Sequence, residues 1–234
     1  MGTERFRVRP RTSAALLLLL FACSPEARKP AASPDRPTAR VADSAEVDTP
    51  AIVILGTSLT AGLGLDPDQA YPAVLQRMLD SAGLHYRIVN AGVSGESSAG
   101  ALRRIGWVLN RAPAVLIIET GANDGLRGQS TDSLRQNLSE IVDSARRLAP
   151  HATLLLARME AMPNLGADYI HRFHLVYPEV ARKEGIPLVP FLLQGVAGVD
   201  SLNQPDGIHP NITGARIVAR NVWVVLAPLL RKAP

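Results

Sequence analysis

Two spacings of apolar residues alternate along the chain. Short unbroken apolar runs, several of them rich in valine and isoleucine, are typical of strands buried on both faces of a parallel sheet. Between these runs, apolar residues recur every three or four positions, as in helices with one buried face. The predicted strands are 51–55, 86–90, 114–119, 153–157 and 188–189, and the predicted helices are 71–82, 101–109, 134–148, 169–180 and about 213–230. We expect the fourth helix to be interrupted near Pro178. Strands that alternate with helices predict one α/β domain with a mostly parallel sheet and helices on both faces.

The first predicted strand ends in a turn that presents a hydroxyl group. Residues 51–55 are apolar and lead into Gly56, Thr57 and Ser58. Gly56 would give the backbone the freedom to leave the sheet sharply. Ser58 would then lie at the carboxyl end of a strand, where open α/β sheets place their ligands. Ser58 is therefore the candidate nucleophile, and the alternative is that it only caps the next helix.

Two further candidate hydrogen-bond donors follow the second and third predicted strands. Gly92 comes just after the second strand and Asn123 just after the third, so the fold would gather both at the same edge as Ser58. The backbone N–H groups of Ser58 and Gly92, with the side-chain amide of Asn123, could then bind the oxyanion of a hydrolytic intermediate. The alternatives are a plain turn at Gly92 and an Asx-turn at Asn123.

A base and an orienting acid lie in one segment near the C-terminus. The Asp206 carboxylate can hold one ring nitrogen of His209 while the other faces Ser58, as in a serine hydrolase triad. The alternative is a surface turn without a catalytic role. His171 and His174 could share a helix face, but no third ligand is near them in the sequence. We therefore expect neither a metal nor another cofactor.

Several sequence blocks in a fixed order resemble the SGNH, or GDSL-like, hydrolase superfamily over residues 51 to about 230. The blocks are 56–59, Gly92, 121–124 and 206–210. Within the superfamily, the residues at 58–62, 90–96 and 121–128 are similar to those of the thioesterase I, lysophospholipase and arylesterase group. The resemblance implies a flavodoxin-like three-layer sandwich with a sheet of about five strands. It also implies Ser58 as the nucleophile, Asp206 and His209 as its partners, and Gly92 and Asn123 in the oxyanion hole.

These observations predict a serine esterase that hydrolyses carboxylic esters or thioesters through an acyl-enzyme on Ser58. The alternatives are a carbohydrate O-acetyl esterase and a non-catalytic envelope lipoprotein that keeps the fold. A loop with Met162, Pro163 and Leu165 follows the fourth strand and offers an adaptable apolar wall for an acyl chain. One residue departs from the family pattern, because Thr57 stands where the family usually has aspartate.

The first 50 residues differ in composition from the rest. Residues 1–23 combine arginines, an apolar stretch and a final Leu-Phe-Ala-Cys that resembles a lipobox, so we expect a signal peptide with lipidation at Cys23. Residues 24–50 are rich in proline, alanine and small polar residues and predict a disordered linker. The catalytic domain would then span 51–234. The expected location is the bacterial cell envelope or periplasm, with a lipid anchor in the membrane.

The distribution of charge excludes one class of partner. The formal net charge of the chain is +4, but residues 1–23 carry +3 and residues 24–50 carry −1, which leaves +2 for the predicted domain. No basic cluster is interleaved with aromatic residues, so we expect no nucleic-acid partner. The expected protein is a monomer that binds a small ester, a thioester or a lysolipid.

Overall fold

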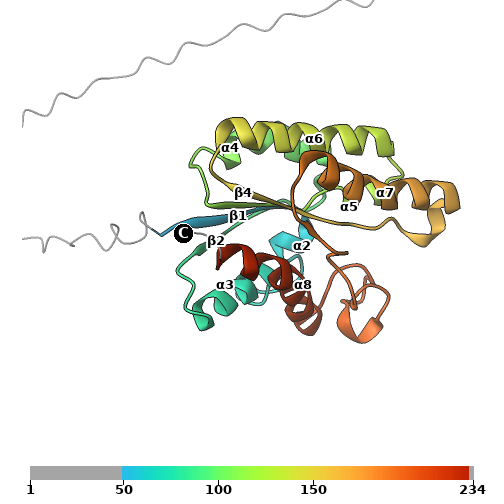
Figure 1. Ribbon diagram of the computed structural model, residues 1–234. Coiled ribbons are helices and arrows are strands. Elements are labelled where there is room, and N and C mark those ends of the chain that lie inside the picture. Colours follow the sequence, from blue (N-terminus) through green and yellow to red (C-terminus); the bar gives the residue numbers. More distant parts are fainter. Residues whose placement is uncertain (1–48, 232–234) are drawn as a thin grey trace, which may run out of the picture. The chain divides into compact units, whose positions relative to one another are not determined.

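The computed structural model describes residues 49–231, and five parallel strands form the central sheet of this part of the chain (Figure 1). The strands are β1 (Ala51–Gly56), β2 (Arg87–Gly92), β3 (Val115–Ile118), β4 (Thr153–Ala157) and β5 (Leu188–Val189). They lie in the order β2-β1-β3-β4-β5. This is the doubly wound order of flavodoxin-like folds, in which ligands bind beyond the carboxyl ends of β1 and β3. The predicted signal peptide 1–23, with Cys23, and most of the predicted linker lie outside the described residues.

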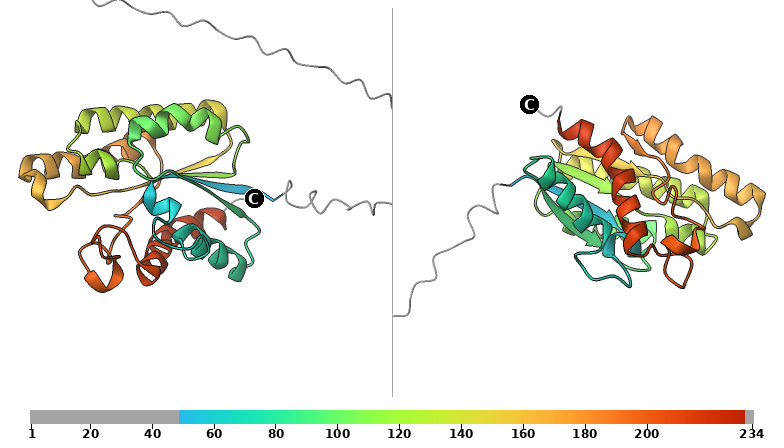
Figure 2. Two further views of the ribbon diagram at one scale, coloured as in Figure 1. Left: turned by 180° about the vertical axis from the view of Figure 1, so that it is seen from behind. Right: turned by 90° about the horizontal axis from the view of Figure 1, so that it is seen from below.

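Helices cover both faces of the sheet (Figures 1 and 2). On one face α6 packs against both α4 and α7, and on the other face α3 packs against α8. Their bounds are α3 (Tyr71–Ser81), α4 (Ser98–Val108), α6 (Thr131–Leu148), α7 (Ala167–Glu184) and α8 (Ile212–Leu230). The short elements are α2 (Ser58–Ala61), α5 (Ala122–Leu126), and the 3-10 turns η1 (Pro163–Leu165) and η2 (Asp200–Leu202). The predicted α/β sandwich is thus confirmed.

The central strands are buried on both faces. All four residues of β3 and the last five of β1 are buried. The register places Leu55 of β1 beside Ile118 of β3, so the apolar runs of these neighbouring strands end together. Burial on both faces explains why these runs show no polar alternation. The residues that follow β1 and β3 therefore begin at the same edge of the sheet, next to its packed core.

Helix α7 differs from the prediction. It runs without a break from Ala167 to Glu184 with Pro178 inside, so the expected interruption near Pro178 is wrong. A proline inside a helix removes one backbone hydrogen bond and costs about 3 kcal/mol. Phe173, Tyr177 and Val180 are almost fully buried on either side of Pro178, and α7 packs on α6. This packing allows the helix to continue through the proline.

Two short helices, α2 and α5, were not predicted, because four or five residues are too few for a hydrophobic period to appear. The N-cap residue of α2 is Thr57, and Ser58 is the first helical residue. The alternative in which Ser58 serves only as a helix cap is therefore wrong. Gly56, in turn, has no positive φ, so its role is not the conformational freedom that the sequence suggested.

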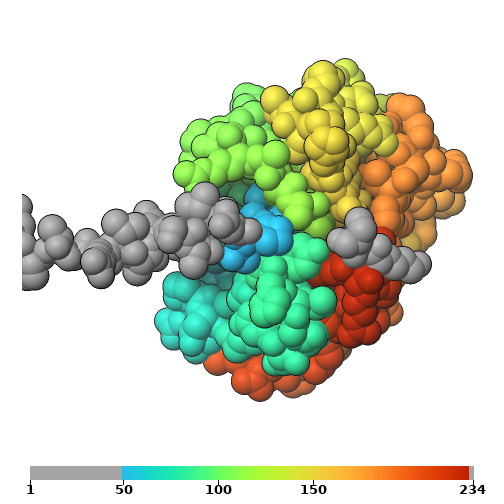
Figure 3. Space-filling model, turned by 60° about the vertical axis from the view of Figure 1, so that its left-hand side comes forward, coloured from blue at the N-terminus to red at the C-terminus, as the bar shows by residue number. Residues whose placement is uncertain are grey.

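Among residues 49–231, α8 is the one helix that is long and apolar enough by length and composition to cross a membrane. Its residues Val218, Val222 and Leu226 are nearly fully buried, and the helix packs on α3, so the apolar character of this side serves the core. Figure 3 views the domain from the side on which β1 begins (blue), with green and yellow segments above it and teal and red segments below it. Ser58 follows the other end of β1 and lies at the opposite edge of the sheet.

Candidate active site

Ser58, His209 and Asp206 form a continuous hydrogen-bonded series at the carboxyl edge of the sheet. Ser58 Oγ lies 2.9 Å from His209 Nε2, and His209 Nδ1 lies 2.6 Å from Asp206 Oδ2. Ser58 comes from the turn between β1 and α2, whereas the other two residues come from the loop before α8. The structure thus brings together the three residues that the sequence singled out, although 151 positions separate Ser58 from His209.

The Asp206 turn fixes the protonation pattern of this series. Asp206 Oδ1 accepts hydrogen bonds from the backbone N–H groups of Ile208 and His209, at 2.9 and 3.0 Å. These two donors, together with the His209 side chain, lower the pKa of Asp206 to about 2. An ionised carboxylate can only accept, so Nδ1 of His209 donates the hydrogen. Nε2 of the neutral ring is therefore the acceptor for the Ser58 hydroxyl, as general-base catalysis requires.

Gly92 lies at the carboxyl edge of the sheet, opposite Gly56, but it does not offer the N–H donor that the sequence analysis expected. Its N–H donates to Asn90 Oδ1 at 2.9 Å and is already used. A side chain at this position would begin 2.3 Å from the backbone nitrogen of Ala61, so Gly92 allows β2 and α2 to approach closely. The prediction of Gly92 as an oxyanion donor is therefore contradicted by the geometry.

Gly95 and Asn123 lie at the cavity beside Ser58 instead. Within residues 49–231, neither the N–H of Ser58 nor that of Gly95 has a hydrogen-bond partner. Asn123 Nδ2 donates one hydrogen bond, at 3.0 Å, to the backbone oxygen of Glu96, which leaves its second hydrogen free. Gly95 has φ +77°, a conformation that favours glycine. Three donors could thus face one oxyanion: the N–H groups of Ser58 and Gly95 and the Asn123 amide.

An ion pair holds the loop that carries Gly95. Arg104 of α4 binds Glu96 through Nε and Nη2, at 2.7 to 2.9 Å, and both side chains are mostly buried. The same guanidinium also donates to the backbone oxygens of Ala91 and Gly56, at 2.8 and 3.2 Å. Arg104 therefore links the ends of β1 and β2 to the loop. The sequence analysis missed both Glu96 and Arg104, since a charged pair eight residues apart gives no distinctive pattern.

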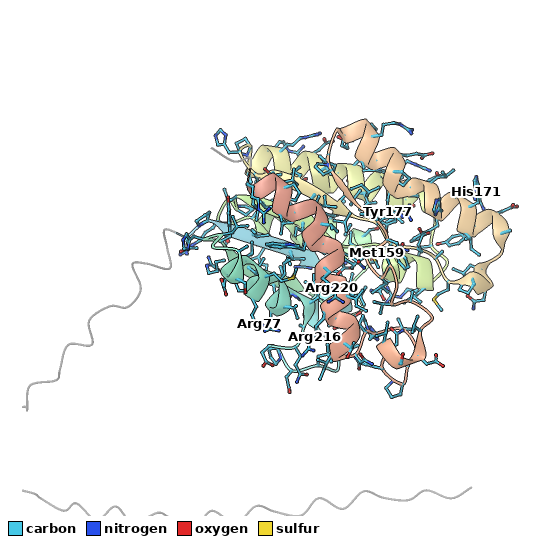
Figure 4. All side chains as sticks on the ribbon, turned by 60° about the horizontal axis from the view of Figure 1, so that its bottom comes forward. Arg77, Met159, His171, Tyr177, Arg216 and Arg220 are labelled. Atoms are coloured by element: carbon cyan, nitrogen blue, oxygen red, sulfur yellow. The ribbon has the colours of Figure 1, made fainter. Side chains whose placement is uncertain are left out.

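A cavity of about 510 Å³ opens beside Ser58 and His209. Most of the side chains on its wall are apolar, among them Leu63, Leu126, Met162, Pro163, Phe191 and Ile208. Met162 and Pro163 thus lie where the sequence analysis expected them. Leu165 does not line the cavity and lies near Gly128, because the chain turns away at η1. Met159 is almost fully buried and also lines this cavity. Tyr177 lies in the interior, whereas Arg77, Arg216 and Arg220 lie on α3 and α8 (Figure 4).

The two histidines of α7 have no arrangement that suggests a metal centre. His174 Nδ1 lies 3.1 Å from Glu160 Oε1, and the Glu160 carboxylate also pairs with Arg158 at 3.0 Å. No group of three or more potential metal ligands occurs in the part of the chain that the structure describes.

The sequence of residues 54–217 matches the GDSL-like Lipase/Acylhydrolase family. The chain belongs to this family. It is 44% identical to Esterase TesA of Pseudomonas aeruginosa over 180 residues, which cover 76% of this chain and 89% of that protein. It is 34% identical to Thioesterase 1/protease 1/lysophospholipase L1 of Escherichia coli over 188 residues, 80% of this chain and 87% of that protein. A crystal structure of TesA, 43% identical, superimposes with a TM-score of 0.73 and covers 76% of this chain and 99% of that chain.

Family membership confirms the resemblance seen in the sequence. As a GDSL-like acylhydrolase, the chain is a hydrolase that acts on ester bonds, and its substrates are small-molecule esters. The esterase class predicted from the sequence is confirmed, and the alternative of a carbohydrate O-acetyl esterase is not favoured by these relatives.

Proposed function

We propose that this family member is a metal-independent serine esterase that hydrolyses carboxylic esters and thioesters through an acyl-enzyme on Ser58. The observation that carries the proposal is the unbroken series from Ser58 Oγ through both nitrogens of His209 to Asp206, with separations of 2.9 and 2.6 Å. The free oxyanion donors and the apolar cavity beside Ser58 support it further.

Each step of the proposed reaction has a group to perform it. His209 Nε2 takes the Ser58 proton while Oγ attacks the substrate carbonyl carbon, and the oxyanion receives hydrogen bonds from Ser58, Gly95 and Asn123. When the tetrahedral intermediate collapses, the bond from carbon to the leaving oxygen or sulfur breaks, and His209 gives its proton to that atom. Water, deprotonated by His209, then attacks the acyl ester and releases the acid and the free Ser58 hydroxyl.

A fluorophosphonate probe tests the nucleophile, because it labels an activated serine covalently. We expect the wild-type protein to be labelled at Ser58, which peptide mass spectrometry can locate. The Ser58→Ala variant should keep the circular dichroism spectrum of the wild type and lose both labelling and turnover. Labelling at another serine, or undiminished turnover in Ser58→Ala, would contradict the mechanism.

The character of the cavity favours short to medium acyl chains on aryl or thiol leaving groups. Flexible and apolar side chains such as Met162 and Leu63 line it, and Phe191 is an aromatic residue on its wall. Aromatic residues make up only 4% of the whole chain, whereas sugar sites more often present aromatic faces. Each buried methylene contributes about 0.8 kcal/mol, so kcat/KM should rise severalfold per methylene until the cavity is filled.

The substrate proposal is tested with p-nitrophenyl esters of increasing acyl length, run beside acetylated xylan. We expect kcat/KM to rise from acetate towards medium chains and no acetate to be released from the polysaccharide. A preference for acetate together with deacetylation of xylan would instead support the carbohydrate O-acetyl esterase. The control is the Ser58→Ala protein, which should hydrolyse neither substrate.

We also propose that the enzyme is exported and held at a membrane by a lipid on Cys23. The support is the sequence alone: an apolar stretch ends in the lipobox-like Leu20-Phe21-Ala22-Cys23, and residues 24–50 could tether the domain. Palmitate labelling in a bacterial host should mark the wild type and spare a Cys23→Ser variant. A label that persists in Cys23→Ser would rule out this anchor.

A further inference from the structure

A buried polar cluster lies directly behind Ser58 and takes no part in the proposed triad. It consists of Thr57, Thr60, Tyr71 and Glu119, which have 0 to 2% of their surface exposed. Glu119 Oε2 accepts the backbone N–H of Thr57 at 2.8 Å and the Thr60 hydroxyl at 2.7 Å. Its Oε1 accepts the Thr57 hydroxyl at 2.9 Å, and the hydroxyls of Thr60 and Tyr71 lie 2.7 Å apart.

A carboxyl group at this place is costly for the fold. Glu119 directly follows four apolar residues of β3, and no ion pair involving it occurs within residues 49–231. Burial raises its pKa, and the hydrogen bonds from the two threonines act in the opposite direction. An isolated buried carboxyl would be strongly destabilising, so these donors must offset much of its desolvation.

We propose that Glu119 is a positioning residue, which fixes the Ser58 turn from both sides and joins it to the segment that carries the oxyanion donor Asn123. The donors to Glu119 come from the residue before Ser58 and from the residue two positions after it. Glu119 itself directly follows β3 and precedes Asn123 by four residues. One side chain thus sets the nucleophile against the oxyanion site. This inference rests on the proposed role of Ser58.

Gly56 makes room for this cluster. A side chain at Gly56 would begin 2.0 Å from Thr60 Oγ1 and 2.7 Å from Glu119 Oε2. Since its φ is not positive, the need for glycine here is spatial. The absence of a side chain at the last residue of β1 therefore leaves the space that Glu119 and Thr60 occupy. This is a second observation in favour of a specific role for the cluster.

Thr57 determines how the protons are distributed. The hydroxyls of Thr57 and Thr60 each donate to Glu119, so the Tyr71 hydroxyl must donate to Thr60. No proton on Glu119 is needed to satisfy the cluster. An aspartate at position 57, as is usual in the family, would place a second carboxyl within hydrogen-bond distance of the first. Two carboxyl groups at this distance must share a proton. Thr57 has no carboxyl group, so Glu119 has no acidic neighbour in the Ser58 turn with which to share one.

The test compares Glu119→Gln, Thr57→Val and Thr57→Asp with the wild type, using kcat, KM and the rate of fluorophosphonate labelling. Misplacement of reacting groups lowers turnover more than binding, so Glu119→Gln should lose about 10- to 100-fold in kcat with little change in KM. Thr57→Val keeps the backbone donor and should lose less. Both should be labelled more slowly at Ser58.

A pH profile adds a reading that a purely structural role would not move. The ratio of the kcat of Thr57→Asp to that of the wild type should fall about tenfold between neutral pH and about pH 9.5, as the carboxyl pair loses its shared proton. The other titratable groups near Glu119 are Tyr71 and Tyr177, and burial raises the pKa of both well above the usual value for tyrosine. Neither is therefore expected to titrate in this range.

Tyr177→Phe is the matched control. It removes a buried hydroxyl that donates to the backbone oxygen of Thr120, next to Glu119, but does not touch the Ser58 turn. Its kcat should stay within about twofold of the wild type even if its stability falls. If Glu119→Gln and Thr57→Val behave like this control, Glu119 is merely structural and the proposal is overturned. If the wild type is not labelled at Ser58, the proposed function itself fails, which is a distinguishable result.

Discussion

Two carboxyl groups near Ser58 lie in opposite surroundings. The Asp206 side chain is 45% exposed, and backbone N–H groups with the His209 ring lower its pKa to about 2. Glu119 is fully buried, and burial raises its pKa. Asp206 therefore keeps a negative charge beside the imidazole that becomes positive during reaction. Glu119 does not contact the reacting atoms and instead binds the backbone next to Ser58. Their surroundings, rather than the type of acid, separate their roles.

The difference also separates activity from stability. Asp206 belongs to a short turn whose hydrogen bonds are largely local, so changing its charge should alter chemistry and leave the fold intact. Glu119 binds residues that lie about 60 positions before it in the sequence, so changing it should weaken the fold as well as the site. Variants at the two positions test this difference.

The largest expected effect is that of Asp206→Asn on kcat. The amide can still accept the N–H groups of Ile208 and His209, but it can also donate to Nδ1 and so permit the wrong tautomer of His209. We expect kcat to fall by up to about 10⁴-fold, as in other triads, with the free energy of unfolding within about 0.5 kcal/mol of the wild type. Steady-state kinetics and urea denaturation measure both quantities. A loss of only a few fold would show that Asp206 does not orient the base.

The next effect concerns stability, and it should appear at the other carboxyl. Glu119→Ala removes the acceptor of three buried hydrogen bonds and leaves a cavity, so we expect the free energy of unfolding to fall by about 3 kcal/mol or more. Urea denaturation of Glu119→Ala beside Asp206→Asn measures the contrast. Equal stabilities of the two variants would remove the distinction between a local turn and a long-range link.

The site residues that the sequence could predict are those whose signal is local. Asp206 and His209 lie in one turn, and Ser58 follows a buried apolar run, so chemistry and short spacing sufficed. The choice between Gly92 and Gly95 could not be made in this way, because Gly92 ends β2 and Gly95 follows it by only three residues. Only the hydrogen bond from Gly92 to Asn90 shows which N–H is already used.

The partner of Thr57 could not be predicted for a different reason. Thr57 and Glu119 become neighbours because β1 lies beside β3, where the backbone N–H of Glu119 donates to Leu55 at 2.8 Å. The apolar runs predicted a parallel sheet, but they did not predict the order of its strands. A glutamate that directly follows four buried strand residues is the one signal that could have marked this position. Similarly, the packing that carries α7 through Pro178 depends on contacts with α6.

The smallest effect is on the pH dependence of stability, and it should have opposite signs at the two carboxyls. The pKa of Asp206 is lowered from 3.8, so its stabilisation is present above about pH 3.8 and is lost as the pH falls towards 2. The pKa of Glu119 is raised from 4.5, so the native state holds its proton more tightly, and stability decreases as the pH rises above 4.5 through the raised value. The difference in Tm between wild type and Asp206→Asn should therefore shrink on acidification from pH 3.8, by about 1 to 2 °C at most because Asp206 is partly screened by water. The difference between wild type and Glu119→Gln should shrink in the opposite direction, as the pH rises. Thermal unfolding followed by circular dichroism across this range measures both, and two differences that move together would contradict the assignment of opposite surroundings.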